Sequence, residues 1–450
     1  MEETFGWARR IVGDTWRLVK SPLYRNAFLI MLSTVIGSGL GFFFWLVVYR
    51  SYENPTDIGA AVALFQTLTF LAALAPLGLG IGIIRFLPES EEKPALVNTA
   101  ATICGSVALV LAVAFLLLVS FVLPELSFAL GNPLYPAAIL LTTVALALPA
   151  IYDQASYAVR RADVLTWRTV ILAVAKIPIV AGLALLPTTA GGGRIGVFLA
   201  LSIATIMSVV VEGFYLLPRV LPGFRPRVLF AFHRVRPMIR FALGNYAANV
   251  IGAAGSLLLP ALILRVLGGG AGPTAVAYFY IAVVVAGLLN IIPGAVFTSF
   301  YAEASQKSAN RYVDERRAIA LSLALLVPGI VVLWFLSYDM LTWFGDPKLA
   351  AGAVSTLRIL VWGSVPTFLN SILGTRVRIR KRTAPMIVGT AIATAVTLGL
   401  GVYLLPIRGI EGLAIATVVG VSAATPYLYA VARKSFKSEA MPPLGPPTES

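Results

Sequence analysis

Residues 97–122 read VNTAATICGSVALVLAVAFLLLVSFV, an apolar segment of 26 residues without a charged side chain. As a helix rising about 1.5 Å per residue, this segment is longer than the roughly 30 Å hydrocarbon layer of a membrane is thick. Further stretches of similar length and hydropathy follow along the chain, so the sequence predicts twelve transmembrane helices. Their ranges are 26–48, 58–84, 97–122, 135–157, 166–186, 196–217, 241–264, 274–301, 318–337, 350–372, 385–405 and 411–432.

The composition excludes most classes of water-soluble protein. Of the 450 residues, 58% are hydrophobic and 12% are charged, so a soluble fold would leave much apolar surface in water. The single cysteine, Cys104, and the single histidine, His233, provide neither a disulfide nor a zinc cluster. We therefore expect no cofactor and no metal site. The net charge of +15 is explained by basic residues that gather on one side of the membrane, so we expect no nucleic-acid partner.

The basic residues predict the orientation of the chain in the membrane. Of the 35 Lys and Arg residues, 28 lie in alternate connections, a set that includes both ends of the chain. Basic residues in short loops stay on the cytoplasmic side. We therefore expect a multi-pass protein of the cell membrane with both termini in the cytoplasm. The opposite connections contain only Arg50, Arg194, Arg265, Lys348 and Arg408.

A short repeat relates the first helix to the seventh. Val35-Ile-Gly is followed by Arg50, and Val250-Ile-Gly is followed by Arg265 at the same spacing. Repeats of this kind occur in transporters built from two similar halves, so we expect two six-helix lobes of the same orientation. The predicted parts are a cytoplasmic amphipathic segment at 1–25, an N-terminal lobe at 26–217, a basic cytoplasmic linker at 218–240, a C-terminal lobe at 241–433 and a disordered cytoplasmic tail at 434–450.

Three motifs around the second helix resemble a known family of transporters. They are NPTDIGA at 54–60, FQTLT at 65–69 and LGLGIGIIRFLPE at 77–89. The chain is similar in these motifs and in its loop rhythm to the multidrug/oligosaccharidyl-lipid/polysaccharide (MOP) exporter superfamily, and within it to Wzx-type flippases of polysaccharides or lipid-linked oligosaccharides. This resemblance implies an all-α, polytopic transmembrane helix bundle with two six-helix lobes around a central cavity.

Two basic residues lie deep in predicted helices. Lys176 and Arg358 are each several turns from a helix end, where a charge costs at least about 2.5 to 3.5 kcal/mol on insertion scales. We expect both to line the cavity and to hold an anionic group such as a pyrophosphate. The alternative is that each pairs with a buried acid or carbonyl.

Other candidates lie nearer the membrane surfaces. Arg50 and Arg265 lie at the predicted outer edge of the membrane. They either anchor the helices at the interface or form a pair of like charges at an outer gate. Such a pair would repel when the gate closes and would bind the anionic substrate. Asp153 and Glu212 lie near the cytoplasmic ends of their helices, where they either snorkel to the surface or pair with nearby arginines, or else form a coupling site for a cation or proton. The amides that serve either helix packing or substrate binding are Asn249, Asn290 and Asn370.

We expect a flippase that moves a lipid-linked oligosaccharide or polysaccharide precursor with an anionic head across the membrane by alternating access, as a monomer in the bilayer. The first alternative is a cation-coupled, MATE-like multidrug antiporter. The helices predicted at 26–48, 241–264, 274–301 and 350–372 contain no acid, which disfavours a cationic substrate. The second alternative, a membrane-embedded glycan-processing enzyme, needs catalytic groups in a large loop, whereas the outer connections have only about 5 to 12 residues.

Overall fold

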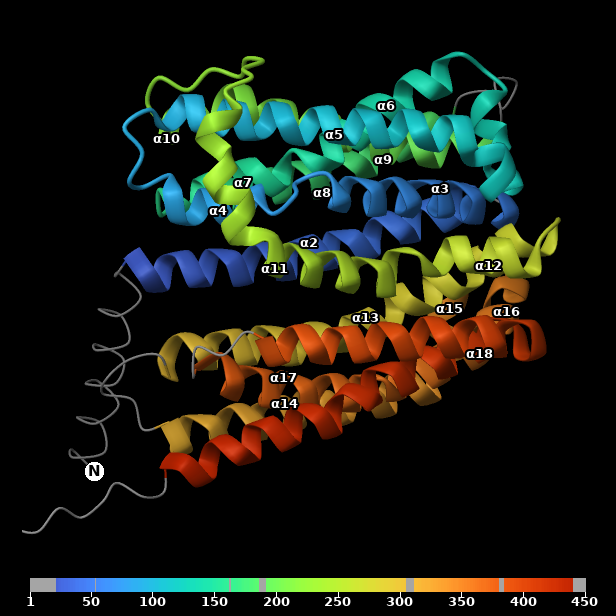
Figure 1. Ribbon diagram of the computed structural model, residues 1–450. Coiled ribbons are helices and arrows are strands. Elements are labelled where there is room, and N and C mark those ends of the chain that lie inside the picture. Colours follow the sequence, from blue (N-terminus) through green and yellow to red (C-terminus); the bar gives the residue numbers. More distant parts are fainter. Residues whose placement is uncertain are drawn as a thin grey trace, which may run out of the picture.

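The computed structural model describes residues 22–52, 54–161, 163–185, 192–304, 311–379 and 384–439, and every regular element in these ranges is a helix (Figure 1). The predicted all-α class is therefore confirmed. In chain order the elements are α2 (Pro22–Ser51), α3 (Pro55–Leu74), α4 (Leu79–Phe86), α5 (Lys93–Val122), the 3-10 helix η1 (Pro124–Leu130), α6 (Leu134–Ala147), α7 (Pro149–Ala158), α8 (Asp163–Ala184), α9 (Gly192–Val211), the π-helix η3 (Glu212–Leu216), α10 (Leu217–Val220), α11 (Phe232–Leu257), α12 (Leu259–Leu267), α13 (Ala271–Ala304), α14 (Arg311–Phe335), α15 (Ser337–Thr342), α16 (Pro347–Trp362), α17 (Ser364–Ile379) and α18 (Ala384–Glu439).

The long helix α18 consists of two antiparallel arms. Gly409 has non-helical torsion angles, with φ at +59°, and it interrupts the helix near its middle. Across this point, Gly401 lies against Leu413 and Gly389 lies against Leu428. Because these pairs are almost symmetric about Gly409, the second arm runs back along the first. α18 therefore crosses a membrane twice.

The number of spans agrees with the sequence prediction. Nine described helices are long and apolar enough to cross a membrane, and the bent pair Tyr246–Leu257 and Leu259–Leu267 makes a tenth. The second arm of α18 and the apolar helix α2, of which Val35–Ser51 is described in full, bring the described spans to twelve. Their outer faces carry bare apolar side chains such as Phe121, which is 81% exposed and suited to contact with lipid. The chain is thus a multi-pass membrane protein.

Two spans are broken at defined positions. The second span splits into α3 and α4 where Leu77 and Gly78 adopt positive φ angles of 49° and 79°. The seventh span bends by 47° between α11 and α12, at Leu258. Pro260 lies in the first turn of α12, where its missing N–H costs nothing within the helix. Such breaks free backbone carbonyls, which membrane proteins tolerate where the backbone is buried in protein or lines a cavity.

The central helix of the packing is α13. It contacts α2 and α3 from the first half of the chain and α12, α14, α16 and α17 from the second. Figure 1 shows α2 to α10 on one side of the molecule and α13 to α18 on the other, and the two sets approach each other most closely at the end where α12, α15 and α16 lie. This is the predicted outer end, since α2 begins at the opposite one.

The structure describes the predicted linker between the lobes and only part of the two predicted terminal segments. Residues 1–21 and 440–450 lie outside the described residues, and with them most of the predicted amphipathic segment and tail. α18 continues as a helix to Glu439. The predicted linker at 218–240 contains α10 and the start of α11. The lobe boundaries remain a prediction.

Candidate functional site

A cavity of about 550 Å³ lies beside the bend between α11 and α12. Helices α13, α16, α17 and α18 complete its wall, and one residue of α3, Gln66, reaches it from the first half of the chain. Gly255, Ser256 and Pro260 line it at the bend itself. The bend therefore forms part of the cavity wall.

The polar lining of this cavity carries no charged side chain among the described residues. It consists of hydroxyl and amide groups set in an apolar wall, namely Gln66, Ser256, Tyr280, Asn290, Thr367, Asn370, Thr390, Thr394, Thr397 and Thr417. Several threonines donate their hydroxyl hydrogen within their own helix, Thr390 to the Met386 carbonyl and Thr417 to the Leu413 carbonyl. Their oxygens remain able to accept further hydrogen bonds.

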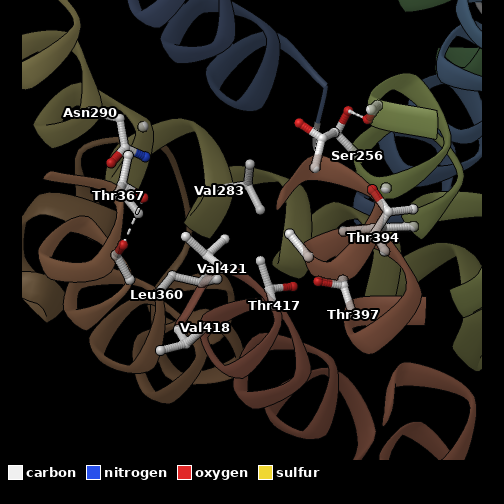
Figure 2. Close-up of a pocket in the computed structure, with 18 of the residues that line it drawn as sticks. Ser256, Val283, Asn290, Leu360, Thr367, Thr394, Thr397, Thr417, Val418 and Val421 are labelled. Atoms are coloured by element: carbon white, nitrogen blue, oxygen red, sulfur yellow. Dashed lines mark hydrogen bonds between the residues drawn. The ribbon is translucent and has the colours of Figure 1, made fainter. Parts of the chain in front are cut away.

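Figure 2 shows how these groups are arranged. The hydroxyl groups of Thr397 and Thr417, from the two arms of α18, point toward each other, and Val283 of α13 faces the same space. Asn290 and Thr367 lie together at one side of the cavity (Figure 2). The cavity thus offers neutral hydrogen-bonding groups on two sides of an apolar centre.

Contacts between the two halves of the chain close the predicted outer end. Tyr49 of α2 donates its hydroxyl hydrogen to the Ala277 carbonyl at 2.6 Å, and Thr56 of α3 lies 2.8 Å from the Thr274 hydroxyl. Arg50 donates from Nε to the Trp343 carbonyl at 2.6 Å. The described structure is therefore an outward-closed state in the predicted orientation.

Lys176 does not line the cavity and is separated from its wall by aromatic side chains of α2. Its ammonium group is 4.9 Å from the centre of the Phe44 ring, at the contact between α8 and α2. Phe44 packs on Trp45, which packs on Tyr280 of the cavity wall, with ring centres 5.0 and 4.8 Å apart. Within the described residues Lys176 forms no ion pair. Its positive charge therefore lies behind the aromatic row of α2, formed by Phe44 and Trp45, which contacts the cavity wall at Tyr280.

The three arginines predicted as substrate contacts also lie away from this cavity. Arg358 donates from Nε to the Ser337 hydroxyl at 2.9 Å and stacks on Trp334, so it has neutral partners on the α14–α15 side. Arg50 contacts the Trp343 carbonyl, and Arg265 is exposed near the end of α12. Their roles in substrate binding remain predictions.

Asp153 and Glu212 lie together with Arg168 in the first half of the chain. Arg168 of α8 donates two hydrogen bonds to the Asp153 carboxylate of α7, at 3.0 and 2.8 Å. Its Nε also lies 3.5 Å from the Glu212 carboxylate, which is fully buried at the start of η3. Asp153 therefore pairs with an arginine, whereas Glu212 lies near the same arginine without a hydrogen bond to it. A coupling role remains a prediction.

Two of the three predicted amides line the cavity. Asn290 lies on α13, and Asn370 lies on α17, where it donates to the Val421 carbonyl and accepts from Thr425. Asn249 is exposed on α11. Sequence reasoning missed the cavity threonines. Their spacing, at 390, 394 and 397, places them on one face of a helix and was the available signal.

Comparisons with known proteins agree with this architecture. The sequence profile of the MatE family matches residues 295–403. The structure of the lipid II flippase MurJ in an inward closed conformation is similar with a TM-score of 0.71 at 16% identity, over 90% of this chain and 87% of that one. A multidrug resistance MATE family transporter of the MOP superfamily, inward-facing, gives 0.62 at 14% identity, over 91% and 98% of the two chains. The chain has the fold of MOP-superfamily transporters.

Another structure with the MOP fold extends the comparison. A MOP superfamily transporter from Pyrococcus furiosus Vc1, described as having a binding pocket of reversed polarity, is similar with a TM-score of 0.57 at 14% identity, over 94% and 98% of the two chains. No curated protein matches the sequence. Identities this low show a shared MOP fold and leave the substrate to be argued from the residues.

Proposed function

We propose that this protein belongs to the MOP superfamily and is a transporter that moves the polar head of a lipid-linked oligosaccharide or polysaccharide precursor across the cell membrane by alternating access. The observation that carries the proposal is the cavity beside the α11–α12 bend, with neutral hydroxyl and amide groups on an apolar wall. Sugars present hydroxyl groups that both donate and accept hydrogen bonds, and their carbon faces pack on apolar and aromatic surfaces.

The charges nearby favour this substrate over a cationic drug. The described cavity lining contains no carboxylate, and the intramembrane acids Asp153 and Glu212 lie beside Arg168. A cation in the cavity would lose its water without gaining an ion pair, which is unfavourable. Lys176, by contrast, supplies a positive charge behind the aromatic row of α2. We infer that it favours an anionic linkage, such as a phosphate ester, passing along that side.

The second candidate is a cation-coupled multidrug antiporter of the MATE type. It is favoured by the match of the MatE profile to residues 295–403. A neutral drug would fit the apolar wall of the cavity as well as a sugar does. The two candidates therefore differ in the role that they give to the hydroxyl groups of the cavity lining.

The experiment uses purified protein in liposomes that carry a fluorescent polyprenyl-phosphate-linked oligosaccharide. We expect the protein to accelerate movement of the labelled head between leaflets, detected as protection from a membrane-impermeant quencher. Thr397→Val with Thr417→Val should slow this movement about tenfold, because two hydroxyl groups that face the substrate are lost. Thr143→Val, at a buried threonine of α6 that bonds within its own helix and lies outside the cavity lining, is the matched control.

A lipophilic cationic drug is tested in the same liposomes. We expect no transport of it with or without an ion gradient. Export of the drug without any movement of the glycolipid head would contradict the flippase and favour the antiporter.

A further inference from the structure

The buried cluster of Asp153, Arg168 and Glu212 has two acids and one base. Arg168 engages both oxygens of Asp153 in a bidentate pair, which already balances its charge. Glu212 is 0% exposed and lies at 3.5 Å from Arg168 Nε without a hydrogen bond. If both acids were ionised, the cluster would hold one net negative charge inside the membrane. An uncompensated buried charge of this kind is strongly unfavourable.

The lack of hydrogen bonds to Glu212 also favours a protonated carboxyl group. Among the described residues no donor reaches either of its carboxyl oxygens. The carboxyl groups of Glu212 and Asp153 are neighbours, but an ionised carboxylate only accepts hydrogen bonds. A proton on Glu212 would supply the missing donor to Asp153 and would cancel the extra charge. One proton therefore satisfies both the charge balance and the hydrogen bonding of the cluster.

The other groups that face the cluster leave a proton as the fitting ligand. From α7, the phenol groups of Tyr152 and Tyr157 lie near Glu212 and Asp153, and Cys104 of α5 lies beyond Tyr152. These groups are neutral, and Arg168 is the one cation described at the cluster. A metal cation would have to sit beside this guanidinium with few oxygen ligands, which hard cations disfavour. A proton needs a single oxygen.

We propose that the Asp153–Arg168–Glu212 cluster is a proton-binding site, with the proton on Glu212, and that its release accompanies the change between transport states. The local backbone suits such a role, because Glu212 opens the π-helix η3, a type of irregularity frequent at functional sites. A groove of about 370 Å³ between α8 and η3 is lined by Trp167 and Val211, the chain neighbours of Arg168 and Glu212. The coupling rests on the proposed transport function, whereas proton binding does not.

The first experiment counts protonated carboxyl groups by infrared spectroscopy of the purified protein at neutral pH, in a detergent without ester groups. We expect a carbonyl stretching band of one buried carboxylic acid that shifts in D₂O. Glu212→Gln and Asp153→Asn should each abolish it, because either change leaves one acid paired with one base. Glu91→Gln, at an exposed acid, is the matched control and should leave the band unchanged.

Replacing Arg168 should have the opposite effect on the infrared band. Arg168→Gln leaves two acids without a cation, so we expect about twice the band amplitude. Arg168→Gln combined with Glu212→Gln leaves one buried acid and should restore a single band, which also shows that the cluster region still folds. An identical spectrum in the wild type and in Glu212→Gln would overturn the proton site.

The second experiment tests coupling without a transport substrate. Spin labels at Ser127 and Ala351, exposed positions on η1 and α16, report the distance between the two halves at the predicted outer end, in a Cys104→Ser background. We expect the distance distribution to change with pH in the wild type and to stay constant in Glu212→Gln. A distribution independent of pH in both would overturn the coupling even where the infrared band is present. Failure of glycolipid movement alone would instead overturn the proposed function.

Discussion

The two halves of the chain bury polar groups in opposite ways. In the first half, Asp153, Arg168 and Glu212 are packed together with almost no exposure, and their ionisable groups face one another. In the second half, neutral threonines and asparagines surround about 550 Å³ of open space. The sequence repeat suggests similar halves, yet the second half supplies almost all of the lining of this cavity, and the buried Asp153–Arg168–Glu212 cluster lies in the first half.

This difference suggests a division of labour. A charged cluster in a low-dielectric interior responds strongly to the gain or loss of a single proton, because each charge must be balanced by its neighbours. A neutral lining responds weakly to pH and can exchange hydrogen bonds with a substrate at little cost. We infer that the first half of the chain senses the driving ion and that the second half holds the cargo. The following predictions test that division.

The largest expected effect is on stability, at Arg168. Arg168→Gln should lower the free energy of unfolding by about 3 to 5 kcal/mol, because it removes the partner of the buried Asp153 carboxylate. Glu212→Gln should cost much less, since it leaves the bidentate pair in place. Thermal unfolding in detergent measures both. Equal losses for the two variants would mean that Glu212, too, depends on Arg168 as an ionised partner.

The next effect is on transport, at Val283. Val283→Trp places an indole in the cavity and should slow glycolipid movement at least about tenfold, with the infrared band of the cluster unchanged. Val402→Trp, at an exposed valine on α18 outside the cavity lining, is the control. If Val283→Trp left transport intact, the substrate would have to pass elsewhere, and the division of labour would fail.

A smaller effect is expected where the halves meet. Arg50→Gln removes the hydrogen bond to the Trp343 carbonyl, which exists in the outward-closed state. We therefore expect the open population, measured with labels at Ser127 and Ala351, to rise about tenfold, a shift of roughly 1.4 kcal/mol. The exposed Arg265 provides the control, Arg265→Gln. The repulsion hypothesis drawn from the repeat predicts the reverse, namely a more closed protein in both variants.

The smallest effect lies at the predicted cytoplasmic surface. The hydrogen bond and the charge of Arg234 lower the pKa of the Glu92 carboxyl. A lowered pKa means that the pair stabilises the fold above the ordinary carboxyl range, and that this contribution is lost as the pH falls through the pKa in the folded protein. Glu92→Gln should therefore lower the unfolding temperature slightly at neutral pH and not at acidic pH. A difference that persists in acid would assign the effect to packing.

Much of the fold could be predicted from the sequence, because the membrane restricts the choices. The length of apolar segments predicted the spans, and alternation of basic loops predicted that the strongly apolar residues 384–433 cross twice. The site was harder to predict. Charge drew attention to Lys176 and Arg358, whereas the cavity depends on the bend at Leu258 and on threonines that resemble ordinary helix packing. Hydropathy alone does not show which face of a transmembrane helix contacts lipid and which lines the cavity.

The attachment of the segment before α11 bears on how the protein is made. Asn98 of α5 donates to the Arg225 carbonyl and accepts from the Arg227 N–H, and Thr102 accepts from the Leu229 N–H. All of these groups have been synthesised before α12 begins. Since N-terminal parts of a chain fold first during synthesis, the first half can hold this segment against α5 while the ribosome is still producing the second. The earlier helices would then act as the assembly template that sets where α11 starts.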